Sequence, residues 1–138
     1  MKQYEAVPKN FLMRKNPVII RHALYLFLDD IRDAPIHYIE QGFQYFCKPK
    51  SVNEAKRYVT EAINTGINEI WFDLDHDLGD YASQGGDAIE LVNWLVEEFH
   101  DKNVDFKFHF HSMNPVGVLN MKSAVEKYWE VYNGSFYL

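Results

Sequence analysis

The sequence alternates between short hydrophobic runs and longer segments in which hydrophobic residues recur every three or four positions. Runs of the first kind are typical of buried β-strands, and the second spacing is typical of helices that bury one face. We therefore expect strands at residues 23–30, 43–47, 69–77 and 105–111, and residues 135–138 are a candidate for a further short strand.

The segments with helical spacing predict three helices, which cover residues 52–63, 88–99 and 118–129. The first of these follows Ser51 and Glu54, which have the S-x-x-E spacing of a capping box at a helix start. The helices are therefore expected between the predicted strands, beginning after the second of them.

Alternation of strands and helices predicts a parallel sheet with helices packed on both faces. We expect an α/β three-layer sandwich whose parallel sheet has four or five strands, joined by right-handed crossovers. In sheets of this kind, ligands bind outside the carboxyl ends of the strands. The polar residues that follow each predicted strand are therefore the first candidates for function.

Acidic residues stand at the ends of two predicted strands, Asp29 and Asp30 in the first and Asp75 in the third. Carboxylates brought together at one sheet edge repel one another, so such a cluster requires either a raised pKa or a cation. Oxygen ligands are those that Mg²⁺ and Mn²⁺ prefer. We predict a metal site of these three residues; the alternative is that they are helix caps and loop acids, for which Asp is common.

Histidines lie at the same predicted edge. His76 stands between Asp75 and Asp77, whose charges favour the imidazolium form that a general acid needs. His109 and His111 share one face of the fourth strand, because side chains alternate along a strand. His76 and His111 are candidates for proton transfer, together with Asp75, and the alternative for each histidine is a structural hydrogen bond. A zinc site formed by the three histidines is a further hypothesis.

The residues after the fourth strand combine a hydroxyl, an amide and a helix start. Ser112 and Asn114 are followed by Pro115 to Gly117, which we expect to lead into the next helix. Backbone amides at a helix start favour an anion. Ser112, Asn114 and Gly117, with His109 behind them, therefore predict a site for a phosphoryl group.

Composition sets bounds on the kinds of partner. The 138 residues are 47% hydrophobic and 16% aromatic, which suits one domain, and the net charge is −6. An acidic protein repels the phosphates of duplex DNA, so we expect no duplex DNA as partner. The exception is residues 1–22, which carry a local charge of +4 and predict a basic N-terminal arm ahead of a domain at residues 23–138.

Cellular location is predicted from what the sequence does not contain. The lone Cys47 excludes an internal disulfide and a cysteine-based zinc site. We find no secretory signal and no hydrophobic run near the roughly 20 residues that span a bilayer. We therefore expect a cytoplasmic protein with no membrane partner.

Three segments carry a family resemblance: LFLDDIRDAP, FDLDHDLGD and FHSMNPVG. They resemble the cyclic-phosphate processing receiver family, a divergent branch of the receiver-like (flavodoxin-like) fold, over roughly residues 23–131. By position, Asp29 and Asp30 resemble the metal-binding acid pair of receivers, Asp75 resembles the phosphorylated aspartate, and Ser112 resembles the hydroxyl residue after the fourth strand. Receivers also carry a lysine at the end of a fifth strand, and residues 135–138 contain none.

The resemblance implies an enzyme that processes cyclic phosphates of nucleotides or RNA ends. Our first hypothesis is a phosphoesterase that uses Mg²⁺ or Mn²⁺ held by the acids, with the histidines transferring protons. The alternative is a non-enzymatic signalling or nucleotide-sensing module with Asp75 as phospho-acceptor. The missing lysine favours the first hypothesis.

Overall fold

The computed structural model describes residues 5–6, 21–34 and 42–133. The elements in chain order are β1 (Glu5–Ala6), β2 (Arg21–Leu28), β3 (Phe43–Cys47), α2 (Val52–Asn64), β4 (Glu69–Leu74), the 3₁₀ helix η2 (Gly79–Ser83), α3 (Ala88–Phe99), β5 (Asp105–Phe110), α4 (Pro115–Val125) and β6 (Glu130–Tyr132). Most of the predicted basic arm and the predicted strand at residues 135–138 lie outside the described residues.

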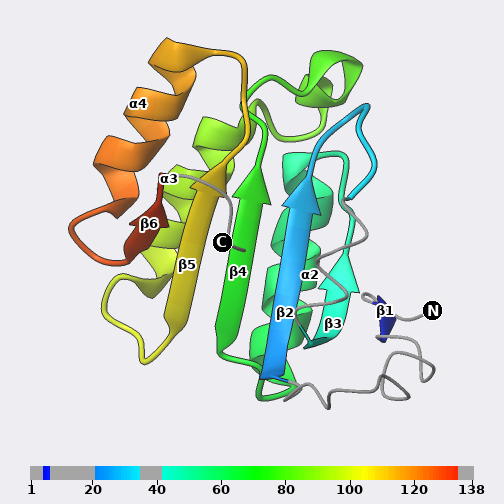
Figure 1. Cartoon of the computed structure of the whole chain (residues 1–138), viewed down its shortest axis with the longest axis vertical. Helices are drawn as coiled ribbons and strands as arrows, with labels where there is room; N and C mark the ends of the chain where they lie inside the picture. Colours follow the sequence, from blue (N-terminus) through cyan, green and yellow to red (C-terminus); the bar gives the residue numbers. More distant parts are fainter. Residues whose placement is uncertain (1–4, 7–20, 35–41, 134–138) are drawn as a thin grey trace.

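The strands form one six-stranded sheet in the order β1-β3-β2-β4-β5-β6. The five strands β3, β2, β4, β5 and β6 are parallel, and the short β1 pairs antiparallel with β3. Figure 1 shows β2, β4 and β5 side by side in the middle of the sheet, with their carboxyl ends at one edge. The predicted α/β class with a parallel, receiver-like sheet is confirmed.

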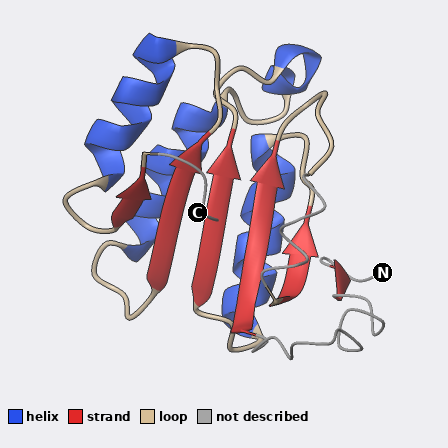
Figure 2. Cartoon of the chain, in the orientation of Figure 1, coloured by secondary structure: helices blue, strands red, loops and turns tan. Residues whose placement is uncertain are grey.

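The three described α-helices pack on the same face of the sheet (Figure 2). Their buried residues join one core with Leu26, Phe72 and Phe108 from the central strands. The opposite face carries a second, smaller buried cluster that includes Tyr25 and Trp71 and contains no residue of these helices. Of the three predicted layers, the described residues therefore form two, the sheet and one helical layer.

The helix starts follow local chemistry. At the start of α2, the backbone N–H of Glu54 donates to Ser51 Oγ over 3.2 Å, as the capping box predicts. α4 begins three residues earlier than predicted, because Asn114 is its N-cap and Pro115 its first residue. Proline suits that position, since its missing N–H has no partner there in any helix. No described helix is long and apolar enough to cross a membrane.

The register of the three central strands decides where the functional residues lie. Leu28 of β2 pairs with Leu74 of β4, and Leu74 pairs with Phe110 of β5. The three strands therefore end at the same level. The next residues, Asp29, Asp75 and His111, therefore follow at one edge of the sheet.

Candidate functional site

His111 lies between two buried carboxylates. Its Nδ1 atom is 2.5 Å from Oδ1 of Asp73, and its Nε2 atom is 2.9 Å from Oδ2 of Asp29. Phe27 stacks on the imidazole, with ring centroids 4.7 Å apart and planes inclined by 2°. The Tyr25 hydroxyl donates to the other oxygen of Asp73 over 2.6 Å. The ring is thus held at both nitrogens and on one face.

These contacts favour the protonated form of His111. Burial on its own lowers the pKa of the imidazole, but the hydrogen bonds and charges of Asp73 and Asp29 outweigh it and raise the pKa above its ordinary value. In the imidazolium form both ring nitrogens donate to carboxylates. The predicted role of His111 in proton transfer therefore lacks an available ring nitrogen in this arrangement.

Asp29 also holds the loop after β2. Its Oδ1 atom accepts the backbone N–H groups of Ile31 and Arg32 at 2.9 and 2.8 Å. Burial raises the pKa of Asp29, but these two N–H groups and His111 outweigh burial and lower it. The Arg32 guanidinium donates to the carbonyl of His111 over 3.1 Å. The loops after β2 and β5 are therefore bound to each other as well as to Asp29.

The three acids predicted to bind a metal are brought together. One carboxylate oxygen from each of Asp29, Asp30 and Asp75 lies within 4.8 Å of the others. Burial and then the charge of Asp29 raise the pKa of Asp75, although Ser112, His111 and the His76 N–H stabilise its charged form. Negative charge at this edge is therefore not fully compensated by the protein.

The donor set fits a hard divalent cation. All three donors are carboxylate oxygens, the ligands that Mg²⁺ and Mn²⁺ prefer. Asp29 uses three of its roughly four acceptor positions for the Ile31, Arg32 and His111 hydrogen bonds, which leaves about one for a metal. Asp30 and Asp75 are only partly buried, so they can supply the other ligands.

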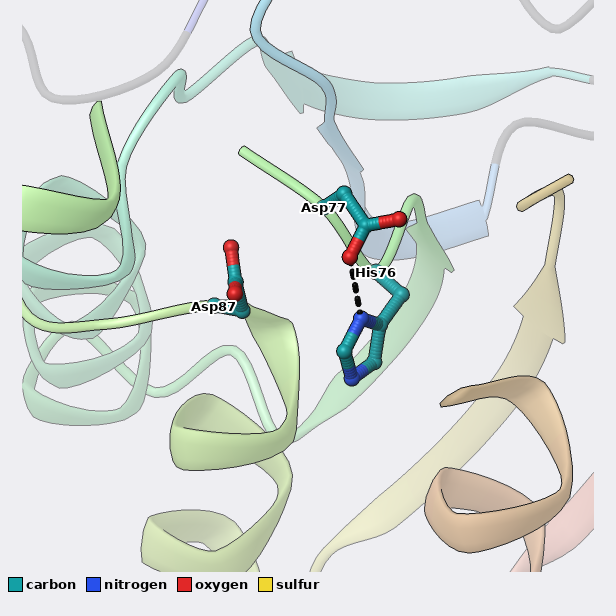
Figure 3. Close-up of side chains that lie close together, drawn as sticks. All are labelled: His76, Asp77 and Asp87. Atoms are coloured by element: carbon teal, nitrogen blue, oxygen red, sulfur yellow. Dashed lines mark hydrogen bonds and ion pairs between the residues drawn. The ribbon is translucent and has the colours of Figure 1, made fainter. Parts of the chain in front are cut away.

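His76 forms a second polar centre beside the acids. Its Nδ1 atom lies 2.8 Å from Oδ1 of Asp77, and Figure 3 shows Nε2 on the side of the ring away from that carboxylate. Because a carboxylate only accepts, Nδ1 is the protonated nitrogen in the neutral ring. The hydrogen bond to His76 lowers the pKa of Asp77 and outweighs the opposing effect of burial. Nε2 has no hydrogen-bond partner among the described residues.

Asp87 lies near this pair, and one donor atom from each of His76, Asp77 and Asp87 falls within 4.8 Å of the others (Figure 3). Asp87 precedes α3, but its Oδ1 atom accepts the backbone N–H of Leu78 over 2.9 Å and makes no cap bond to its own helix. Its role in the structure is to hold the loop after His76.

The residues predicted to bind phosphate are largely bonded to one another. Asn114 Oδ1 accepts the backbone N–H of Gly117 over 2.9 Å, and Ser112 Oγ accepts the N–H of Asn114 over 3.1 Å. A Cβ atom on Gly117 would lie 2.6 Å from the His76 ring. Gly117 therefore makes room for His76, and its N–H is occupied by the helix cap. The Asn114 amide nitrogen lies 3.4 Å from both Asp77 oxygens.

His109 lies apart from these groups. It pairs in register with Asp73 and Tyr132, and its Nδ1 atom is 3.4 Å from the Tyr132 carbonyl. In the described part of the chain, His76, His109 and His111 form no cluster that could hold a metal. The hypothesis of a three-histidine zinc site is therefore wrong for this geometry.

Sequence reasoning missed three residues that surround His111. Asp73, Tyr25 and Phe27 were assigned to strands without a role, yet each contacts the imidazole or its partner. One signal was available in the sequence. Asp73 interrupts the hydrophobic run of β4 and is buried, and a buried carboxylate requires a partner.

Comparison with known proteins gives one family. The family model described as the cyclic-phosphate processing receiver domain matches residues 24–127. No curated protein matches the chain. Among solved structures, a fusion that contains a trimeric coiled coil of yeast Spc42 is 12% identical over 84% of this chain and 71% of its own, with a TM-score of 0.48.

Proposed function

Because the chain belongs to the family of cyclic-phosphate processing receiver domains, we propose that it is a phosphoesterase that opens a cyclic phosphodiester. The substrate class is a nucleotide or RNA terminus that carries a 2′,3′-cyclic phosphate. The observation that carries the proposal is the adjacency of two centres at one sheet edge, the acid cluster around Asp75 and the His76–Asp77 pair.

His76 is the proposed proton-transfer group. The hydrogen bond from Nδ1 to Asp77 orients the ring and fixes its tautomer, as a carboxylate does for a catalytic histidine. Nε2 then faces the substrate. In the forward reaction it takes a proton from the attacking water or gives one to the leaving ribose oxygen, and a solvent water serves at the other position.

The bond changes are those of hydrolysis. A water oxygen forms a new bond to phosphorus, one of the two ribose oxygen–phosphorus bonds breaks, and the product is a phosphomonoester. The water loses one proton and the released ribose oxygen gains one, so no net proton or electron is exchanged.

Asp29, Asp30 and Asp75 would hold Mg²⁺ or Mn²⁺, and such an ion polarises phosphoryl oxygens when bound. The imidazolium form of His111, which its two carboxylate partners favour, contributes positive charge beside Asp29, and Ser112 supports Asp75. We therefore assign His111 to electrostatic support of the cluster and not to proton transfer.

The test is hydrolysis of adenosine 2′,3′-cyclic phosphate with and without Mg²⁺ or Mn²⁺. His76→Gln should reduce kcat about 10²- to 10⁴-fold, the usual contribution of a general acid or base. His100→Gln is the matched control, because His100 is an exposed histidine whose ring bonds the Val96 carbonyl. Equal activity in the two variants would exclude His76 as the proton-transfer residue, and no turnover by the wild type with any of the ions contradicts the proposal itself.

A second candidate function is a phospho-acceptor module. It is favoured by the hydrogen bond between Asp75 and Ser112, which corresponds to the aspartate and hydroxyl of receivers. Beryllofluoride with Mg²⁺ should then shift the amide resonances of the loops after β4 and β5. Absence of such a shift, together with nucleotide turnover, supports the enzyme.

A further inference from the structure

A cavity of about 370 Å³ lies between the start of α2 and η2. One wall is the first two turns of α2, which present Asn53 and Arg57, and another is η2 and the residue after it, which present Tyr81 and Gln84. Lys50 and Ser51, just before the helix, and Glu54 in its first turn also line the cavity. The volume is within the range of small-molecule sites, about 300–1,000 Å³.

The lining combines the groups that bind a nucleotide. Lys50 and Arg57 are exposed cations, Tyr81 offers an exposed ring, and Asn53 and Gln84 offer amide donors and acceptors. Cations bind phosphate, aromatic rings stack on bases, and amides read base edges. This positive charge is local, since the whole chain carries −6.

One acid also lines the cavity, and it is already engaged. Glu54 Oε1 accepts the backbone N–H of Lys50 over 2.8 Å, so this carboxylate is held at the helix start. The two cations outnumber the one acid in the lining. An anion is therefore a better occupant than a cation.

Residues at both walls of the cavity contact Asp30, a member of the acid cluster. Lys50 Nζ donates to the Asp30 carbonyl over 3.4 Å. A Cβ atom on Gly79, the first residue of η2, would lie 2.7 Å from the Asp30 carboxylate, so η2 begins against Asp30. The two walls are also joined, because the Asn53 N–H donates to the Gln84 carbonyl over 3.0 Å.

We propose that this cavity binds the nucleoside and the 5′-side phosphate of the nucleotide whose cyclic phosphate lies at the acid cluster. The inference rests on the proposed function and adds which substrate the enzyme prefers. Lys50 and Arg57 bind the 5′ phosphate, and Tyr81 stacks on the base. The preferred substrate is then an RNA end or a 5′-phosphorylated nucleotide, and a nucleoside cyclic phosphate without a 5′ phosphate is a poor one.

The first experiment measures binding without turnover. Dissociation constants for adenosine 5′-monophosphate, adenosine and inorganic phosphate are determined by calorimetry on the full chain in EDTA. The monophosphate should bind at least tenfold more tightly than either fragment. Arg57→Gln should weaken the monophosphate about tenfold, the value of one charge-assisted hydrogen bond, and Tyr81→Leu should do so by a similar factor through lost stacking.

Lys56→Gln is the matched control. Lys56 precedes Arg57 on the same helix, but its ammonium group lies over the Trp94 ring and does not line the cavity. Arg57→Gln and Lys56→Gln each replace a cation in the same turn of α2. Equal dissociation constants for Arg57→Gln and Lys56→Gln overturn the proposal, as does equal binding of adenosine and its monophosphate.

The second experiment compares kcat/KM for adenosine 2′,3′-cyclic phosphate with and without a 5′ phosphate. A preference for the 5′-phosphorylated substrate that disappears in Arg57→Gln supports the inference. Turnover of both at the same rate overturns it and leaves the phosphoesterase standing. Monophosphate binding that depends on Arg57 in a protein without turnover supports the cavity and contradicts the phosphoesterase alone.

Discussion

His111 and Asp73 are 38 positions apart in the sequence, yet the Nδ1 atom of the histidine lies 2.5 Å from the aspartate oxygen. Both side chains are nearly removed from solvent, with 14% and 3% of their surfaces exposed. A second carboxylate, that of Asp29, lies at the other ring nitrogen. One cation therefore stabilises two buried acids, and one of these belongs to the candidate metal site.

The first prediction concerns the titration of His111. Its pKa is raised above 6.5, because Asp73 and Asp29 outweigh burial. In the metal-free protein, NMR titration of the His111 imidazole should show a pKa above 6.5, the ordinary value of a histidine. A His111 pKa at or below 6.5 contradicts the stabilisation of its imidazolium form by Asp73 and Asp29.

The same shift sets the sign of a pH effect on stability. A histidine with a raised folded pKa contributes stability that is fully present below its unfolded pKa, near 6.5, and is lost as pH rises through the folded value. The difference in unfolding free energy between the wild type and His111→Gln should therefore be greatest below that pH and smaller above the raised pKa. Urea unfolding in EDTA at a series of pH values measures it.

Asp73→Asn is expected to destabilise the fold strongly. The substitution removes one of the two charges that face a buried imidazolium, and breaking such a pair costs about 3–5 kcal/mol. Tyr25→Phe is the matched comparison, since it removes only the hydroxyl that donates to Asp73 and should cost about 1–3 kcal/mol. Urea unfolding should give a lower midpoint for Asp73→Asn than for Tyr25→Phe. A higher midpoint for Asp73→Asn would show that the ion pair of Asp73 with His111 does not stabilise the fold.

Much of the site could be predicted because strand periodicity and strand ends are local signals. Asp29, Asp75 and His111 each follow a hydrophobic run, and parallel pairing in register brings run ends to one edge. The sequence therefore sufficed to place the acids and the histidine together. Asn114 and Gly117 were also placed correctly beside this edge, at the start of α4.

The hydrogen-bond partners of the site side chains could not be predicted, because they depend on the directions in which side chains of different strands point. His111 was expected to transfer protons, but its nitrogens face Asp73 and Asp29, which are 38 and 82 positions away. Asn114 was expected to bind phosphate, but its oxygen caps α4. No periodicity in the sequence tells a free polar group from one that is already bonded.

Removal of one acid should have opposite effects with and without metal. Asp75 has a raised pKa from burial and from Asp29, so its charge is unfavourable in the metal-free fold. Asp75→Asn should therefore raise the melting temperature in EDTA. In the wild type, Mg²⁺ or Mn²⁺ at 100 times its dissociation constant should add about 2.7 kcal/mol of stability, and this gain should disappear in the variant.

Asp80→Asn serves as the control for that experiment, because Asp80 is an exposed acid of η2 outside the cluster. Its metal response should match that of the wild type. A wild-type melting temperature that does not change with either ion removes the metal site from the proposal, and an unchanged response in Asp75→Asn removes Asp75 from it.

The last prediction uses the contact between His76 and Gly117. A Cβ atom at Gly117 would lie 2.6 Å from the ring, so Gly117→Ala must displace the imidazole from its hydrogen bond with Asp77. A displacement near 1 Å can cost about 10²-fold in rate. Stability should change little, since alanine in a helix favours folding by about 1 kcal/mol over glycine and offsets part of the clash.

A double-mutant cycle separates this effect from damage to α4. If Gly117→Ala acts through the imidazole, it should reduce kcat about 10²-fold in the wild type and have almost no effect in the His76→Gln background. Additive losses in the double variant would mean that Gly117 supports the site by another route, such as the Asn114 cap. Asp77→Asn tests the His76–Asp77 pair as a unit. If Asp77 orients the ring, Gly117→Ala should cost less activity in the Asp77→Asn background than in the wild type.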